Sequence, residues 1–346
     1  MNAQPPLPEP RGPLSEALER VLRGGGSGWF AGGSVSVDEP LADDDLHLSL
    51  YLCYELHYRG LDGVDPGLEW DPAVLTFRAA LERPFERALR DAVRVDPPEP
   101  AHLPGLLRSL ARGDTGRLSR FLERHATLEQ FREFLIHRSA YHLKEADPHS
   151  FAIPRLSGAA KTAIAEIQAD EYGGGRPEWM HATLFAGTMR ALGLDDAEGA
   201  LLDRIPGWTL ATVNAMSLFG LHRRLRGAAV GHLAMFELTS TTPNRRYGNG
   251  LRRLGFDDQA TRFFDEHVEA DAVHEAIAAD DLVGSLVEAE PELAPDVLFG
   301  ARALLALEGR FGERLLSTWR CDGSSLRPTD RPHVPTRSQP PVADVA

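Results

Sequence analysis

His267-Val268-Glu269-Ala270-Asp271-Ala272-Val273-His274 is the stretch that says most about this sequence. It lies within residues 258–278, which contain no Gly or Pro and are predicted to form a helix. At 100° per residue, the side chains at 267, 271 and 274 fall within about 60° of one another. Two imidazoles and a carboxylate on one helix face form half of a transition-metal site. A solvated polar face is the alternative that this stretch alone leaves open.

Composition describes an ordinary globular chain. Its 346 residues can form one large or two smaller domains with a sizeable core. Hydrophobic residues make up 42% and charged residues 25%. The formal net charge of −14 argues against a nucleic-acid partner, because phosphate binding needs clustered Lys and Arg. The short basic run Arg223-Arg224-Leu225-Arg226 is interpreted as a solvated helix face.

The cysteines and the N-terminus exclude further classes of protein. Cys53 and Cys321 are too few and too far apart for a disulfide framework or a Cys-ligated zinc site. The first residues lack the basic and apolar regions of a secretory signal. No apolar run approaches the roughly 20 residues of a membrane span. We therefore expect a cytoplasmic protein with no membrane partner.

The remaining sequence predicts an all-α bundle with short connections. Residues 1–40 are expected to be a disordered or loop-rich N-terminal segment, 41–320 the helical domain and 321–346 a disordered tail. Asp147-Pro148 is expected to end one helix, and Thr242-Pro243 to cap and begin another. The predicted helices are 42–60, 72–92, 101–112, 115–124, 127–146, 156–171, 178–192, 205–221, 223–240, 242–254, 258–278 and 291–318. In such bundles, metal sites are built from side chains on facing helices.

Residues 133–181 are rich in acidic and histidine side chains that could complete a metal site. Glu145 and Glu171 fall at predicted helix C-termini, where the macrodipole disfavours a carboxylate that lacks a compensating cation. A bound metal would explain their position. Ordinary surface acids in an acidic protein are the alternative.

The spacing of Glu145, Glu171, His181 and the opening stretch resembles the heme-oxygenase-like di-iron oxidase and oxygenase family. The resemblance spans roughly residues 120–280 and includes Gln168–Pro177. It implies a heme-oxygenase-like helical bundle and an iron-dependent enzyme that activates O2 to oxidise a small organic substrate in a biosynthetic reaction. It implies two Fe(II) ions per chain, the second of them weakly held, and no heme. The implied metal ligands are Glu145, Glu171, His181, His267, Asp271 and His274.

Several alternatives stay open. Glu133 is the alternative to Glu145 as the first carboxylate ligand. Glu178 is the alternative to Glu171, because Glu178-x-x-His181 resembles the acid-x-x-His pairs of ferritin-like bundles. Glu237 is expected to orient a ligand histidine, and Tyr141 to line the oxygen pocket or pack in the core. Manganese is an alternative to iron, and a homodimer is an alternative to the monomer. The competing functions are a non-catalytic helical binding module and a ferritin-like iron-handling protein.

Overall fold

The computed structural model describes residues 4–25, 35–113 and 116–328, and all regular structure in these ranges is helical. The prediction of an all-α fold is confirmed. The α-helices are α1 (Pro13–Leu22), α2 (Asp44–Glu55), α3 (Pro72–Ala92), α4 (Leu103–Arg112), α5 (Arg117–Arg124), α6 (Leu128–His142), α7 (Asp147–Ser150), α8 (Gly158–Glu171), α9 (His181–Ala191), α10 (Gly207–Leu221), α11 (Arg226–Arg253), α12 (Asp258–Ala276), α13 (Ser285–Ala289) and α14 (Ala294–Arg320). A π-helix, η8 (Ile277–Gly284), continues α12 without a break, and short 3₁₀ turns join other elements.

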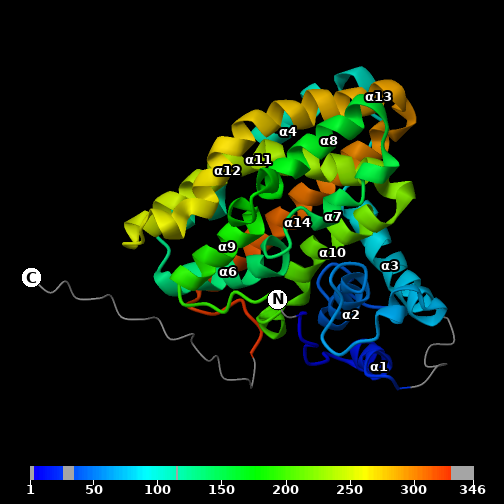
Figure 1. Cartoon of the computed structure of the whole chain (residues 1–346), viewed down its shortest axis with the longest axis vertical. Coiled ribbons are helices and arrows are strands. Elements are labelled where there is room, and N and C mark those ends of the chain that lie inside the picture. The colour runs from blue at the N-terminus through cyan, green and yellow to red at the C-terminus, as the bar shows by residue number, and fades with distance from the viewer. Residues whose placement is uncertain (1–3, 26–34, 114–115, 329–346) are drawn as a thin grey trace, which may run out of the picture.

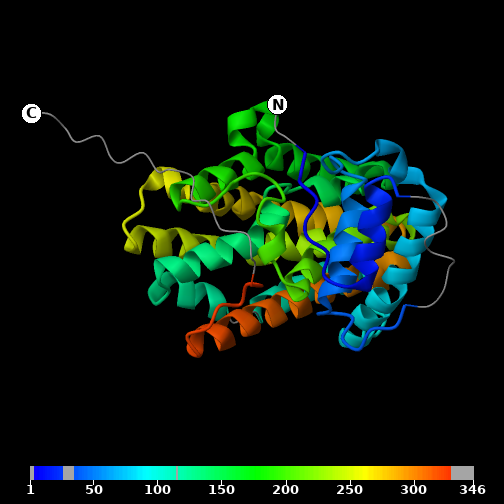
Figure 2. The same ribbon diagram turned by 90° about the horizontal axis from the view of Figure 1, so that it is seen from below.

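Helix α11 forms the centre of the bundle. It packs against α12, α14 and α5, while α10 packs against α2 and α12 packs against α9. Residues 207–220 of α10 are buried apart from Trp208, and so are residues 227–235 of α11. Figure 1 shows α4, α8, α11 and α12 running alongside one another above α14. In Figure 2 the N-terminal helices lie at one end, and the turn between α11 and α12 lies at the other.

Two glycines allow α11 and α14 to touch through their backbones. A Cβ at Gly231 would lie 1.8 Å from the carbonyl oxygen of Val297, and one at Gly300 would lie 2.0 Å from that of Ala228. Any larger residue would collide with backbone at these positions. Gly231 and Gly300 therefore determine where α11 and α14, the two longest helices, approach each other most closely.

The predicted helix boundary at Thr242-Pro243 is wrong, because α11 continues through Pro243 to Arg253. Pro243 cannot donate a hydrogen bond to the carbonyl of Thr239, a loss that normally disfavours proline inside a helix. Packing of α11 against α12 and α14 on either side of this position maintains the helix. The local sequence signal was overridden by tertiary contacts.

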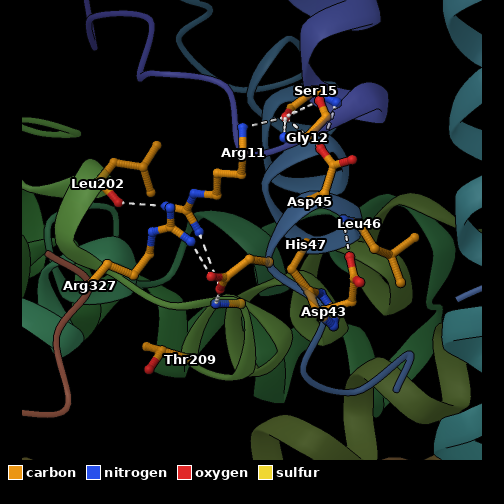
Figure 3. A network of polar contacts seen from close by, with 12 residues as sticks. Arg11, Gly12, Ser15, Asp43, Asp45, Leu46, His47, Leu202, Thr209 and Arg327 are labelled. Carbon is orange, nitrogen blue, oxygen red and sulfur yellow. Dashed lines mark hydrogen bonds and ion pairs between the residues drawn. The ribbon is translucent and has the colours of Figure 1, made fainter. Parts of the chain in front are cut away.

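The N-terminal segment is more ordered than expected, since it contains helix α1 with Leu18, Val21 and Leu22 buried. The backbone N–H groups of Leu14 and Ser15 each donate to the Asp45 carboxylate at 2.8 Å (Figure 3).

Arg11 makes further contacts between the same segment and the bundle. Its Nη2 donates to the carbonyl oxygen of Leu202 at 2.8 Å, and its Nη1 lies 3.9 Å from Asp44, which also binds Arg327 (Figure 3). Segments near both ends of the chain therefore meet at Asp44.

Residues 321–328 also pack against the bundle, which corrects the expectation of a disordered tail beginning at 321. The buried Glu133 carboxylate accepts hydrogen bonds from Trp319 Nε1 at 2.8 Å, Ser324 Oγ at 2.7 Å and the Ser325 backbone at 2.8 Å. Glu133 thus holds the C-terminal segment. None of the helices in the described ranges has the length and apolar composition of a membrane span.

Candidate metal centre

Two groups of buried side chains in the bundle interior have the composition of a metal site. The first is Glu145, Glu171, His181 and His267, and the second is Glu171, Glu237 and His274. In each group, one potential ligand atom per residue lies within 4.8 Å of every other. Glu171 belongs to both groups, so the two candidate sites share one carboxylate.

Glu145 lies in a turn rather than in a helix, because α6 ends at His142. Ala146, the next residue, has φ 75°, a conformation that costs a residue with a Cβ energy. Gln168 on α8 donates from Nε2 to the Ala146 carbonyl at 3.0 Å and holds this turn. The strained turn directs Glu145 toward α8 and α12, where it meets Glu171 and His267.

A glycine turn brings Glu171 and His181 together. Glu171 is the last residue of α8, and His181 is the first of α9. Between them, Gly173 has φ 73°, and a Cβ there would lie 2.7 Å from the Met180 nitrogen. This close approach folds the start of α9 against the end of α8. His181 Nδ1 consequently lies 2.9 Å from Glu171 Oε2.

The two histidines of α12 present different ring nitrogens to the site. His267 Nδ1 pairs with the Phe263 carbonyl at 2.8 Å, and its Nε2 lies 3.6 Å from Glu145 Oε1. His274 Nδ1 lies 3.3 Å from Glu237 Oε2. The predicted helix face therefore does point into the bundle at 267 and 274.

The electrostatics of the site indicate a need for positive charge. Burial raises the pKa of Glu237, and the Glu171 carboxylate adds to this effect while His274 opposes it. Burial lowers the pKa of His274, but Glu237 and Asp170 outweigh it and raise the pKa to about 9. Buried carboxylates this close together are costly unless cations compensate them.

The donor atoms fit a metal ion. Glu145 Oε2, His181 Nδ1 and His274 Nδ1 are buried and make no hydrogen bond, although carboxylates approach both nitrogens. Two ligands at about 2.1 Å from one ion lie roughly 3 Å apart when they subtend a right angle. A cavity of about 30 Å³ beside Glu145, Glu171, Glu237 and His267 offers space for small ions or water.

The remaining predicted residues take different positions. Tyr141 is buried and lines the same small cavity. Glu178 is exposed, and His181 begins a separate helix, so the two do not share the helix face that the ferritin-like scheme requires. Glu133 belongs to neither ligand group. Asp271 lies in α12, but its side chain is outside the described part of the structure.

Glu237, predicted to orient a ligand histidine or to be an alternative ligand, stands among the potential ligands. Sequence reasoning missed two contacts that the structure makes plain. His142 Nδ1 lies 2.8 Å from Glu145 Oε1, and Asp170 Oδ2 lies 3.1 Å from His274 Nε2. The i, i+3 spacing of His142 and Glu145 is a local signal that could have indicated the first pair. Asp170 and His274 are 104 residues apart, and no local pattern joins them.

A larger cavity of about 440 Å³ adjoins Glu145 and His267. Aromatic rings from α6, α9, α11 and α12 line part of it, and charged and polar side chains line other parts. An ion pair between Arg138 and Glu308, with Nη1 to Oε1 at 2.8 Å, faces it from α6 and α14. Its volume lies in the range of small-molecule sites.

Comparisons with known proteins found a family, a relative and a solved structure to which this chain is similar. A family model described as an iron-containing redox enzyme, of the heme-oxygenase type, matches residues 132–309, just over half of the chain. Nitrosourea synthase from Streptomyces achromogenes subsp. streptozoticus is 27% identical over 170 residues, which are 49% of this chain and 36% of that protein. The chain thus spans about a third of that relative's length. A CADD-like protein of unknown function from Nostoc punctiforme PCC 73102 has a TM-score of 0.49 and 20% identity, over 63% of this chain and 97% of that one.

Proposed function

Because the chain belongs to the family of iron-containing redox enzymes, we propose that it is a non-heme di-iron enzyme that uses O2 to oxidise a small organic molecule. The observation that carries the proposal is the pair of ligand groups sharing Glu171. Two overlapping groups are what two neighbouring ions with a bridging carboxylate require. A single ion would leave either His181 and His267 or His274 and Glu237 without a role.

In this proposal, Glu145, His181 and His267 would hold one iron, and Glu237 and His274 would hold the other. Glu171 belongs to both groups and would be available to either ion. Asp271 remains a ligand predicted from the sequence. The four carboxylates would then balance the charge of two divalent ions. Carboxylate and imidazole ligands suit Fe(II) and also Mn(II).

The bound irons would supply the activation of O2 and the redox chemistry. The protein would supply binding, orientation and exclusion of water. The 440 Å³ cavity is the proposed substrate site, because Glu145 and His267 form part of its wall. Its aromatic rings would pack against apolar parts of the substrate, and the Arg138–Glu308 pair offers charge of both signs to polar substrate groups.

N-oxygenation is the reaction that the comparisons favour, since the curated relative is a nitrosourea synthase. Its name refers to a compound with a nitroso group on nitrogen. Desaturation and oxidative C–C cleavage are the alternatives predicted from the resemblance. Product analysis by mass spectrometry separates them, because only N-oxygenation adds oxygen to nitrogen.

The test is anaerobic loading with Fe(II) followed by exposure to O2. We expect two irons per chain by metal analysis and a transient visible absorption band after mixing. A protein that binds at most one ion contradicts the di-iron proposal. Fe(II) oxidation with assembly into large oligomers would instead favour an iron-handling protein.

A further inference from the structure

The geometry points to Asp170 as a positioning residue that orients His274 and strengthens its binding to the second metal ion. This inference rests on the proposed function, since His274 has a metal to bind only in a di-iron site. Asp170 and Glu171 are neighbours at the end of α8 but have different surroundings. Glu171 is buried within both ligand groups, whereas the Asp170 side chain is 59% exposed.

His274 makes the link between the exposed carboxylate and the site. Its side chain is only 1% exposed, and its two nitrogens face different acids. Nε2 lies 3.1 Å from Asp170 Oδ2 with the geometry of a hydrogen bond. Nδ1 lies 3.3 Å from Glu237 Oε2 and makes no hydrogen bond.

A metal can bind only the neutral form of the ring, and in that form the contact with Asp170 favours one tautomer. If Nε2 carries the proton and donates it to Asp170, the lone pair of Nδ1 points at Glu171 and Glu237, where a metal would bind. The opposite tautomer would put a proton on the nitrogen that faces the site. A carboxylate that accepts from a ligand histidine fixes its tautomer and raises its basicity.

His267 provides an internal contrast on the same helix. Its Nδ1 pairs with the backbone carbonyl of Phe263, which leaves Nε2 for the site. The carbonyl that orients His267 belongs to the backbone of its own helix. The orientation of His274 instead depends on the Asp170 side chain from α8. The orientation of His274 can therefore be tested by a single substitution that replaces none of the proposed ligands.

The experiment is a titration of the full chain with Co(II), followed by calorimetry and by visible absorption, for wild type, Asp170→Ala and Asp170→Asn. We expect wild type to bind two ions, and Asp170→Ala to bind the weaker one roughly 10- to 100-fold less tightly. Asp170→Asn keeps an acceptor but loses the charge, so its loss should be smaller. The tighter ion should be unaffected in both variants.

The matched control is Glu166→Ala, which removes an exposed acid one turn earlier on α8. It should bind both ions as wild type does, which separates the specific contact from a general loss of surface charge. Circular dichroism checks the fold. Asp170→Asn nearly preserves the shape of the side chain, so it carries the test if the alanine variant is unstable.

A second measurement reports on orientation directly. In Zn(II)-loaded protein with ¹⁵N-labelled histidine, the His274 ring should show a protonated Nε2 and a metal-bound Nδ1. Asp170→Ala should shift the Nε2 resonance and speed exchange of its proton, effects that a merely structural role would not produce. Unchanged Co(II) affinity and an unchanged His274 signal in Asp170→Ala would overturn the inference. A wild-type chain that binds fewer than two ions would instead overturn the proposed function, and this inference with it.

Discussion

Single side chains determine how much charge the site can hold. Glu145 shows this most clearly: burial acts to raise its pKa, but His142 and His267 outweigh burial and lower it. A buried carboxylate kept ionised in this way is ready to bind a cation without first losing a proton. His142 and His267 therefore hold the Glu145 carboxylate in the form that binds a cation.

Replacing His267 by Ala tests the first ligand group. We expect iron content to fall from two ions per chain to one, because the first ligand group loses an imidazole while the second keeps its ligands. A loss of thermal stability should accompany this, because the His267 ring packs against Phe263 and His181. Metal analysis after anaerobic loading and thermal unfolding measure the two effects. His102→Ala, at an exposed position, is the control. A variant that keeps both irons but unfolds far more easily would show His267 to be a structural residue.

The sequence predicted the ligand helix well and the contacts between helices poorly. The spacing of His267 and His274 identifies their shared face, because helical periodicity is a local property. The hydrogen bond from His274 to Asp170 depends on how α8 and α12 pack, which local spacing does not encode. Helix α1 was missed for a related reason: Pro and Gly flank it, and burial of Leu18 and Leu22 stabilises it.

At the scale of elements, the turn between α8 and α9 is the critical connection. Gly173 allows Met180 to lie against the end of α8, which sets the distance between Glu171 and His181. The contact between α11 and α14 at Gly231 and Gly300 has a similar role for the bundle as a whole. Each is a place where only glycine fits.

Gly173→Ala should reduce iron binding by moving His181 away from Glu171. The added Cβ would meet the Met180 nitrogen at 2.7 Å. Gly174→Ala is a close control, because its φ is also positive, at 57°, but no atom lies within 4 Å of the added Cβ. It should lose about 1–2 kcal/mol of stability from the backbone conformation alone and keep its iron. Equal iron content in both variants would contradict the assigned role of Gly173.

Gly300→Ala should destabilise the bundle by about 1–3 kcal/mol, since α14 must move away from α11 to accommodate the methyl group. Urea denaturation gives this free energy of unfolding. Gly309→Ala on the same helix has open space around the new Cβ and should gain up to about 1 kcal/mol from helix propensity. A Gly300→Ala protein as stable as wild type would show that the helices separate easily.

At the scale of the whole molecule, buried neutral histidines make the fold sensitive to acid. Burial lowers the pKa of His137 from 6.5 to about 3, with Arg138 and Arg204 contributing. His47, enclosed near α10, has its pKa lowered to about 4, also mainly by burial. Below pH 6.5 these histidines become protonated in the unfolded chain but stay neutral in the folded chain. Stability is therefore full above this pH and falls as the pH decreases toward the folded-state pKa values.

His137→Gln should weaken this dependence. Each such histidine contributes a slope of about 1.4 kcal/mol per pH unit between the two pKa values. At pH 7 the variant should be less stable than wild type, because hydrogen bonds to Thr209 and Ser325 are disturbed. That difference should shrink as the pH falls to 5, in urea denaturation at several pH values. His102→Gln should follow wild type throughout, and a difference independent of pH would contradict the assignment.

The hydrogen bonds of Glu133 bear on where this protein can be trimmed. The family match ends at residue 309, and Glu133 lies inside it. Its carboxylate nevertheless accepts hydrogen bonds from Trp319, Ser324 and Ser325, which lie beyond the match. A chain that ended at Arg320 would lose Ser324 and Ser325, two of these three partners, and would expose the Glu133 carboxylate. No ion pair of Glu133 is seen among the described residues. Boundaries for expression should therefore follow the side chains that touch the bundle, and here they extend at least through Arg327, which binds Asp44.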